Sequence, residues 1–117
     1  GSFVITKGLD PCVVAYPVVE WQKVEERLRN LSSASRMYRS FIRATVRYAT
    51  PVTLDKQGRI QITPGLRKFA GLDKDAIIIG VVNKIEIWNP ETLSELERTT
   101  LSVDSKQFED LADKIIL

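Results

Sequence analysis

A repeated pattern constrains the fold of this chain more than any other feature of its sequence. When Pro17 is aligned with Pro90, an offset of 73 residues superimposes two segments without a gap. Each segment holds a strand-like run, a turn, a second strand-like run and a proline where a helix would begin. Identity between the copies is low, so the ordered pattern of residue types carries the inference. It predicts two tandem units of the same topology.

The correspondence between the two copies also predicts where the units divide. The offset places Phe3–Thr6 on Ala76–Ile79 and Val14 on Ile87. The later copy is preceded by a further hairpin and short helix over Val52–Leu72, whereas the chain begins where the earlier copy would need that element. We therefore expect residues 1–48 to form an incomplete first unit with two helices, and 49–117 a complete second unit with C-terminal helices. A strand borrowed from another chain is one way to complete the first unit.

Hydrophobic periodicity and turn residues predict the individual elements. Thr63 as an N-cap, Pro64 as the first helical residue and Gly71 as a left-handed cap predict a short helix. Cys12 lies beside a β-branched run, as a buried strand cysteine would. The predicted strands cover 3–6, 12–16, 52–54, 59–62, 77–82 and 85–88, and the predicted helices cover 18–31 (ended by Ser32 and Ser33, which can cap the next helix), 34–48, 64–70, a segment from Pro90 and a tail from Ser105.

The residue types that the chain lacks restrict its chemistry. It has no histidine and one cysteine, which excludes histidine-activated nucleophiles, an intrachain disulfide and the usual zinc sites. The acidic residues are scattered, so we expect no enzyme, no cofactor, no metal and no small-molecule substrate. No apolar run approaches the roughly 20 residues that cross a bilayer, and no secretory signal is recognisable. We expect a cytosolic protein that does not enter membranes.

Charge is segregated along the chain although the net formal charge is only +2. Between Arg36 and Lys68 there are eight basic residues and a single acidic one, Asp55. Between Pro90 and Leu117 there are seven acidic residues and three basic ones. This distribution predicts one surface that faces a polyanion and another that faces solvent.

The loop from Asp55 to Arg59 is the candidate binding element. Gly58 can take a positive φ and lets backbone N–H groups approach a phosphate closely. The forked guanidinium of Arg59 suits a guanine edge or a phosphate, and Lys56 adds a point charge. The alternative is an ordinary turn in which Asp55 pairs with Arg59 and nothing binds, and composition alone favours that alternative.

A second basic feature lies on the helix predicted at 34–48. Four arginines share one helical face, at i, i+3, i+7 and i+11: Arg36, Arg39, Arg43 and Arg47. The opposite face is apolar, with Met37, Phe41, Ala44, Val46 and Tyr48. Three carboxylates of the preceding helix, Glu20, Glu25 and Glu26, are available to pair with the arginines within or between subunits. We expect a solvated or salt-bridged face, with direct DNA contact as the minor alternative.

The run Val52–Leu72 resembles an AbrB-type swapped-hairpin DNA-binding unit, with its strand, Asp-x-x-Gly-Arg turn, strand and proline-started short helix. Two further segments narrow the resemblance to the MraZ family of bacterial regulators. One is Thr6–Cys12, followed by Tyr16, Pro17 and Trp21, and the other is Asn83–Trp88. Together these segments cover nearly the whole chain.

The resemblance implies an α+β fold: an AbrB-like swapped-hairpin β-barrel of two tandem units, the first incomplete, with flanking helices. It implies a sequence-specific DNA-binding repressor of bacterial division and cell-wall genes, associated with the nucleoid. MraZ proteins carry two such units and assemble into rings on repeated promoter sequences, so the expected partners are double-stranded promoter DNA and further copies of the chain. The residues that it places at DNA are Lys56, Gln57, Gly58, Arg59, Arg67 and Lys68.

An alternative of a different class is an antitoxin-like or scaffold protein that binds a partner through its C-terminal segment. That reading predicts a tail that is disordered until the partner binds. The tail instead has the apolar spacing of an amphipathic helix, with Phe108, Leu111, Ala112, Ile115 and Ile116 at i, i+3, i+4, i+7 and i+8.

Overall fold

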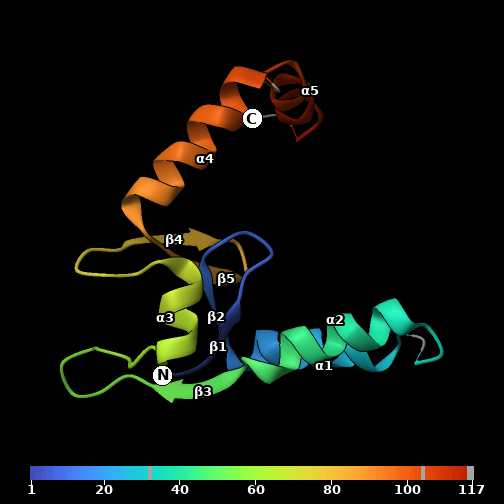
Figure 1. Ribbon diagram of the computed structural model, residues 1–117, viewed down its shortest axis with the longest axis vertical. Helices are drawn as coiled ribbons and strands as arrows, with labels where there is room; N and C mark the ends of the chain where they lie inside the picture. Colours follow the sequence, from blue (N-terminus) through green and yellow to red (C-terminus); the bar gives the residue numbers. More distant parts are fainter. Residues whose placement is uncertain (32, 104, 116–117) are drawn as a thin grey trace.

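The β-branched runs pair into one antiparallel sheet, and helices extend from its two ends (Figure 1). This computed structural model describes residues 1–31, 33–103 and 105–115. The strands in that part are β1 (Ser2–Lys7), β2 (Val13–Pro17), β3 (Thr50–Thr53), β4 (Ile77–Val81) and β5 (Lys84–Trp88). The helices are α1 (Val18–Arg29), α2 (Arg36–Arg47), α3 (Pro64–Ala70), α4 (Pro90–Val103) and α5 (Ser105–Ile115). The expected α+β class is confirmed.

The order of the strands is β3-β1-β2-β5-β4, and every neighbouring pair is antiparallel. The sheet is not closed, because within the described residues β3 and β4 are free edges. The expected barrel is therefore not found there. One reason is that the predicted strand over Arg59–Ile62 does not form. Ile60 and Ile62 pack against the core while Arg59 and Gln61 are exposed. The polar–apolar alternation therefore predicted correctly which side chains are buried, but it predicted the wrong backbone conformation.

The sheet has the symmetry that the sequence repeat predicts. A hairpin that leads into a helix occurs twice, as β1-β2-α1 and as β4-β5-α4. At the offset of 73, Val13 corresponds to Glu86 and Val14 to Ile87, and the structure pairs Val13 with Ile87 and Val14 with Glu86. A local two-fold axis thus passes between β2 and β5 and exchanges β1 with β4. β3 pairs with the outer edge of β1. The two-fold axis relates the position of β3 to the outer edge of β4.

Side chains on the two faces of the sheet build separate cores, because successive strand residues point to opposite faces. On one face Leu66 and Ala70 of α3 pack against the strands, together with Ile5, Val13, Ala15 and Ile87. On the other face Trp88 packs with Cys12 and Val14. The ring of Trp21 on α1 lies 5.6 Å from that of Tyr16, which brings α1 to this second face.

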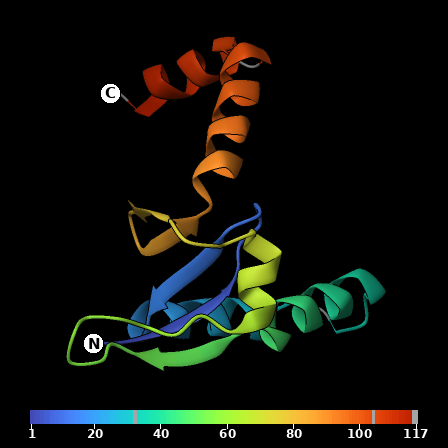
Figure 2. The ribbon, with the colours of Figure 1, turned by 60° about the vertical axis from the view of Figure 1, so that its left-hand side comes forward.

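Helices α1 and α2 form a hairpin that projects from one end of the sheet (Figure 2). The side chain of Ser35 caps α2 by accepting a hydrogen bond from Tyr38 N, so α2 begins at Arg36, two residues later than predicted. Ser32 lies outside the described residues, as does Ile116 of the predicted tail stripe. The predicted apolar face of α2 does not meet a core: Met37 and Phe41 are exposed and no α2 residue is buried.

The turn between β4 and β5 is displaced by one residue from its predicted position. It consists of Val82 and Asn83, and Lys84 is already the first residue of β5. Val82 has a φ of 65°, which is strained for a β-branched residue, and its side chain is fully exposed.

None of the helices in the described ranges combines the length and apolarity needed to cross a bilayer.

Cys12 is predicted to be unreactive in the folded protein. It is buried, as expected from the sequence, and burial, with smaller contributions from Glu86 and Asp10, raises its pKa from 9.0 to about 12. The thiolate is the reactive form, so alkylation by iodoacetamide at pH 8 should be slow in buffer and fast in urea. The pKa of Cys12 is higher in the folded than in the unfolded chain. The contribution of its protonated thiol to the free energy of unfolding is therefore complete below about pH 9 and is lost as the pH rises towards 12. Rapid alkylation of the native chain would contradict the assignment.

Candidate nucleic-acid interface

The loop from Asp55 to Arg59 is closed by hydrogen bonds to a single residue. The Asp55 carboxylate accepts from the backbone N–H of Gln57 and of Arg59, both at 2.9 Å. Asp55 N–H donates to the Arg59 carbonyl at 2.8 Å, and Gly58 N–H donates to the Asp55 carbonyl at 3.0 Å. These bonds, the one from Arg59 N–H first, hold the pKa of Asp55 below its usual range. The carboxylate therefore orders the loop in its ionised form.

Gly58 is needed in this loop for its backbone conformation. Its φ of 75° lies in the left-handed region, where a side chain is strained. Space is not the constraint, since a Cβ built at Gly58 would meet nothing within 4 Å. The glycine thus lets the chain reverse while Lys56 and Gln57 remain exposed at the tip.

Asp55 orients Arg59 without occupying all of its hydrogen-bond donors. Arg59 Nε donates to Asp55 Oδ2 at 3.2 Å, and the arginine side chain keeps 72% of its exposure. In the described part of the chain this Nε contact is the only hydrogen bond of the guanidinium, which leaves the terminal amino groups to donate to a partner. The ion pair proposed as the alternative to binding is present, and its geometry presents Arg59 to solvent.

Helix α3 carries the other two expected DNA contacts. The Thr63 side chain accepts from Leu66 N at 3.5 Å, and Gly71 ends the helix with a φ of 64°, so both predicted caps are confirmed. Leu66 and Ala70 face the core, which turns Arg67 and Lys68 towards solvent. The side chain of Asn89 ties this helix to α4, because it donates to the Gly71 carbonyl at 2.7 Å and accepts from Glu91 N and Thr92 N.

The structure unites four of the six expected residues in one loop and leaves the α3 pair apart from them. The loop projects beyond the N-terminal end of α3, on the side away from the α1–α2 hairpin (Figures 1 and 2). Arg67 and Lys68 line a shallow hollow with Asp73. Each group has one carboxylate beside it, Asp55 in the loop and Asp73 near α3, so it is the projection of the loop that makes it the stronger candidate for contact with an anion.

The ion pairs that α1 could make with the arginines of α2 do not form within the described chain, which leaves the solvated face and pairing between subunits as the remaining expectations. In the described residues Glu20 pairs with Lys23, and Glu26 pairs with Arg29, each one helical turn away on α1 itself. Arg39 instead donates to two backbone carbonyls of the preceding turn, at 2.7 and 3.0 Å. Helical neighbours at i+3 meet without further ordering of the chain, which favours these local pairs over contacts between helices.

Two features were not identified from the sequence, one in the loop and one away from it. Asp55 was expected to compete for Arg59, yet it organises the whole loop, and its spacing from Gly58 is the signal that could have shown this. Lys7 lies over the ring of Tyr48 at 4.0 Å, a contact between distant segments that no local pattern indicates. No group of three potential metal ligands occurs among the residues that the structure describes.

Comparison with known protein families identifies this arrangement. The family model described as “MraZ protein, putative antitoxin-like” matches residues 46–115, which are 70 of the 117 residues and include the loop and α3. The chain belongs to the MraZ family. MraZ is a family of regulators rather than of enzymes, so membership indicates a regulatory role. The match begins at the end of α2 and runs through α5, covering the segment that holds all six expected site residues.

Proposed function

We propose that this MraZ protein is a sequence-specific DNA-binding repressor of bacterial division and cell-wall genes. The loop geometry is the observation that supports it: Asp55 fixes the backbone and one edge of the Arg59 guanidinium, while the other edge faces solvent. A guanidinium held in this way can donate two parallel hydrogen bonds to O6 and N7 of a guanine in the major groove. Lys56 and Gln57 at the loop tip would contact phosphates or neighbouring base edges.

The repressor would act as a homo-oligomer that binds repeated promoter sites. A single loop offers few contacts, so binding strength would come from several loops that engage one DNA molecule together. Exposed apolar side chains on α2 and the free edge of β4 are surfaces on which copies can associate. Such a protein would be found on the nucleoid.

Replacing Arg59 with alanine tests the site. We expect promoter affinity to fall by about 1–3 kcal/mol for each engaged loop, roughly 5- to 150-fold, because a bidentate base contact is lost. Fluorescence anisotropy with a promoter duplex and a random duplex of equal length measures this loss. Affinity for the promoter should fall more than affinity for the random duplex.

Arg98 provides the matched control. It lies on α4, is as exposed as Arg59 at 71%, and also pairs with a carboxylate in the same segment, Glu95. Arg98→Ala should leave promoter binding unchanged. Unchanged promoter binding by Arg59→Ala would refute the assignment of the loop.

A second function has an observation of its own. The family description includes the word antitoxin-like, and α5 exposes Phe108, Leu111 and Ile115 along one side. This amphipathic helix could dock in the groove of a partner protein. The regular helix over Ser105–Ile115 weighs against the disordered free tail that this reading predicts, so DNA binding is preferred.

A further inference from the structure

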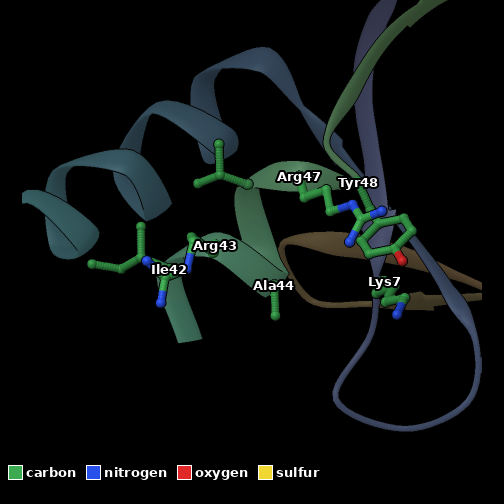
Figure 3. Close-up of a pocket in the computed structure, with 7 residues that line it drawn as sticks. Lys7, Ile42, Arg43, Ala44, Arg47 and Tyr48 are labelled. Carbon is green, nitrogen blue, oxygen red and sulfur yellow. The ribbon is translucent and has the colours of Figure 1, made fainter. Parts of the chain in front are cut away.

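A hollow at the C-terminal end of α2 gathers positive charges that the loop does not use (Figure 3). Its lining consists of Lys7, Ile42, Arg43, Ala44, Val46, Arg47 and Tyr48. Three of these residues are cations and none is acidic. The floor between the cations is apolar, which lowers the local dielectric and strengthens attraction for an anion.

Two of the cations are held in place by aromatic rings. Figure 3 shows Tyr48 between Arg47 and Lys7. Lys7 Nζ lies 4.0 Å from the centroid of the Tyr48 ring and 4.7 Å from that of Phe69, and Arg47 Cζ lies 5.5 Å from the Tyr48 centroid. A ring face attracts the charge without taking up the N–H donors as a carboxylate would. These contacts position the two cations without occupying their N–H donors with an acceptor.

The hollow continues into the arginine stripe, defined as Arg36, Arg39, Arg43 and Arg47. Successive arginines are three or four residues apart, which corresponds to about 4.5–6 Å along a helix. Each strand of DNA carries one negative charge per 3.4 Å or so of helix axis, so the two spacings are comparable. The sequence has no acidic residue from position 27 to position 54. The stripe thus carries four positive charges on one face of α2, and its own stretch of sequence supplies no carboxylate to neutralise them.

We propose that the stripe and hollow bind the phosphate backbone of double-stranded DNA independently of its sequence. The inference rests on the proposed function, and it adds a second contact region to the loop. The α1–α2 hairpin and the loop lie on opposite sides of the lower part of the molecule in Figure 1. The molecule measures 38 Å in one dimension, which is comparable with the roughly 34 Å of one DNA turn, so a single duplex is long enough to meet both regions.

The distribution of charge favours DNA over an acidic protein surface. The acidic residues of α4 and α5 lie at the far end of the molecule from α2 (Figures 1 and 2). Within one chain they cannot neutralise the stripe. A dipolar molecule of this kind would approach DNA with the α2 end first.

The test is the salt dependence of DNA binding by the double variant Arg36→Gln/Arg43→Gln. These two positions are chosen because Arg39 holds backbone carbonyls and Arg47 stacks on Tyr48. On a random duplex, the slope of log Kobs against log salt should become shallower by about 1.8 for each bound protomer, since each lost phosphate contact contributes about 0.9. Promoter and random affinities should fall by the same factor, which leaves the sequence preference intact.

Two control variants separate the stripe from net charge and from folding. Lys106→Gln/Lys114→Gln removes the same two charges from α5 and should leave the slope unchanged. Arg36→Lys/Arg43→Lys keeps the point charges and should restore it. Light scattering on each variant reports the assembly state.

The possible outcomes are distinct. A slope equal to that of the unaltered protein overturns the proposal, and so does loss of assembly with an unchanged slope, which would assign the stripe to the acidic helices of a second copy. Equal affinity of the unaltered protein for promoter and random duplexes would refute the proposed function instead. The slope on the random duplex still decides the role of the stripe in that case.

Discussion

Replacing Trp88 with alanine is expected to lower the free energy of unfolding by about 3–5 kcal/mol. Trp88 is 2% exposed and fills the core on one face of the sheet, against Cys12 and Val14, with Ile79 and Leu93 partly covering it. Its Nε1 also donates to Glu86 Oε1 at 2.9 Å, so the variant loses a hydrogen bond as well as the ring. A native domain is stable by only about 5–15 kcal/mol, so this single substitution would remove a substantial part of the total stability.

Urea denaturation followed by far-UV circular dichroism measures this loss. Trp88→Phe keeps most of the buried ring but not the N–H donor, so its cost should be clearly smaller. A Trp88→Ala midpoint close to that of the original protein would contradict the packing described for this face.

Replacing Leu66 with alanine is expected to cost about 2–5 kcal/mol. Leu66 is completely buried and contacts the core on the face opposite Trp88, where residues of both hairpins meet. It is also the main attachment of α3 to the sheet. Loss of its side chain should therefore loosen the helix that carries Arg67 and Lys68 as well as lower overall stability.

Leu9 is the matched control for Leu66, since the same substitution removes the same atoms from a side chain that is 94% exposed. Leu9→Ala should change stability by no more than about 0.5 kcal/mol. Equal urea midpoints for the two alanine variants would show that α3 does not contribute to the core. The same denaturation curves should stay single transitions, because both cores share one sheet.

Elements encoded by neighbouring residues were predictable from the sequence. Thr63, Pro64 and Gly71 set the start and end of α3 within eight positions of one another, and the structure has both caps as expected. The interior of the loop from Asp55 to Arg59 is equally local, because Asp55 closes it with bonds to residues at most four positions away. Local signals of this kind need no knowledge of the rest of the chain.

Features that depend on a distant partner were not predictable. The alternation of Ile60 and Ile62 shows which side is buried, but a strand also needs a neighbouring strand with free hydrogen-bonding groups, and none pairs with this segment in the structure described. The apolar residues of α2 likewise form one face, but nothing in their spacing specifies whether a core covers it. The spacing of charges likewise could not specify whether α1 and α2 pair within one chain, and in the described residues the glutamates of α1 that form ion pairs do so on α1 itself.

The pairing of β3 with β1 has a consequence for how this chain can change over generations. β3 lies in the second predicted unit, yet it completes the edge of the first, with Phe3 opposite Val52. Whether a substitution in either strand is tolerated therefore depends on the residue that it faces across the boundary. The two halves cannot diverge as independent copies, and a recombination event that exchanged one half alone would bring together strands that had never been matched.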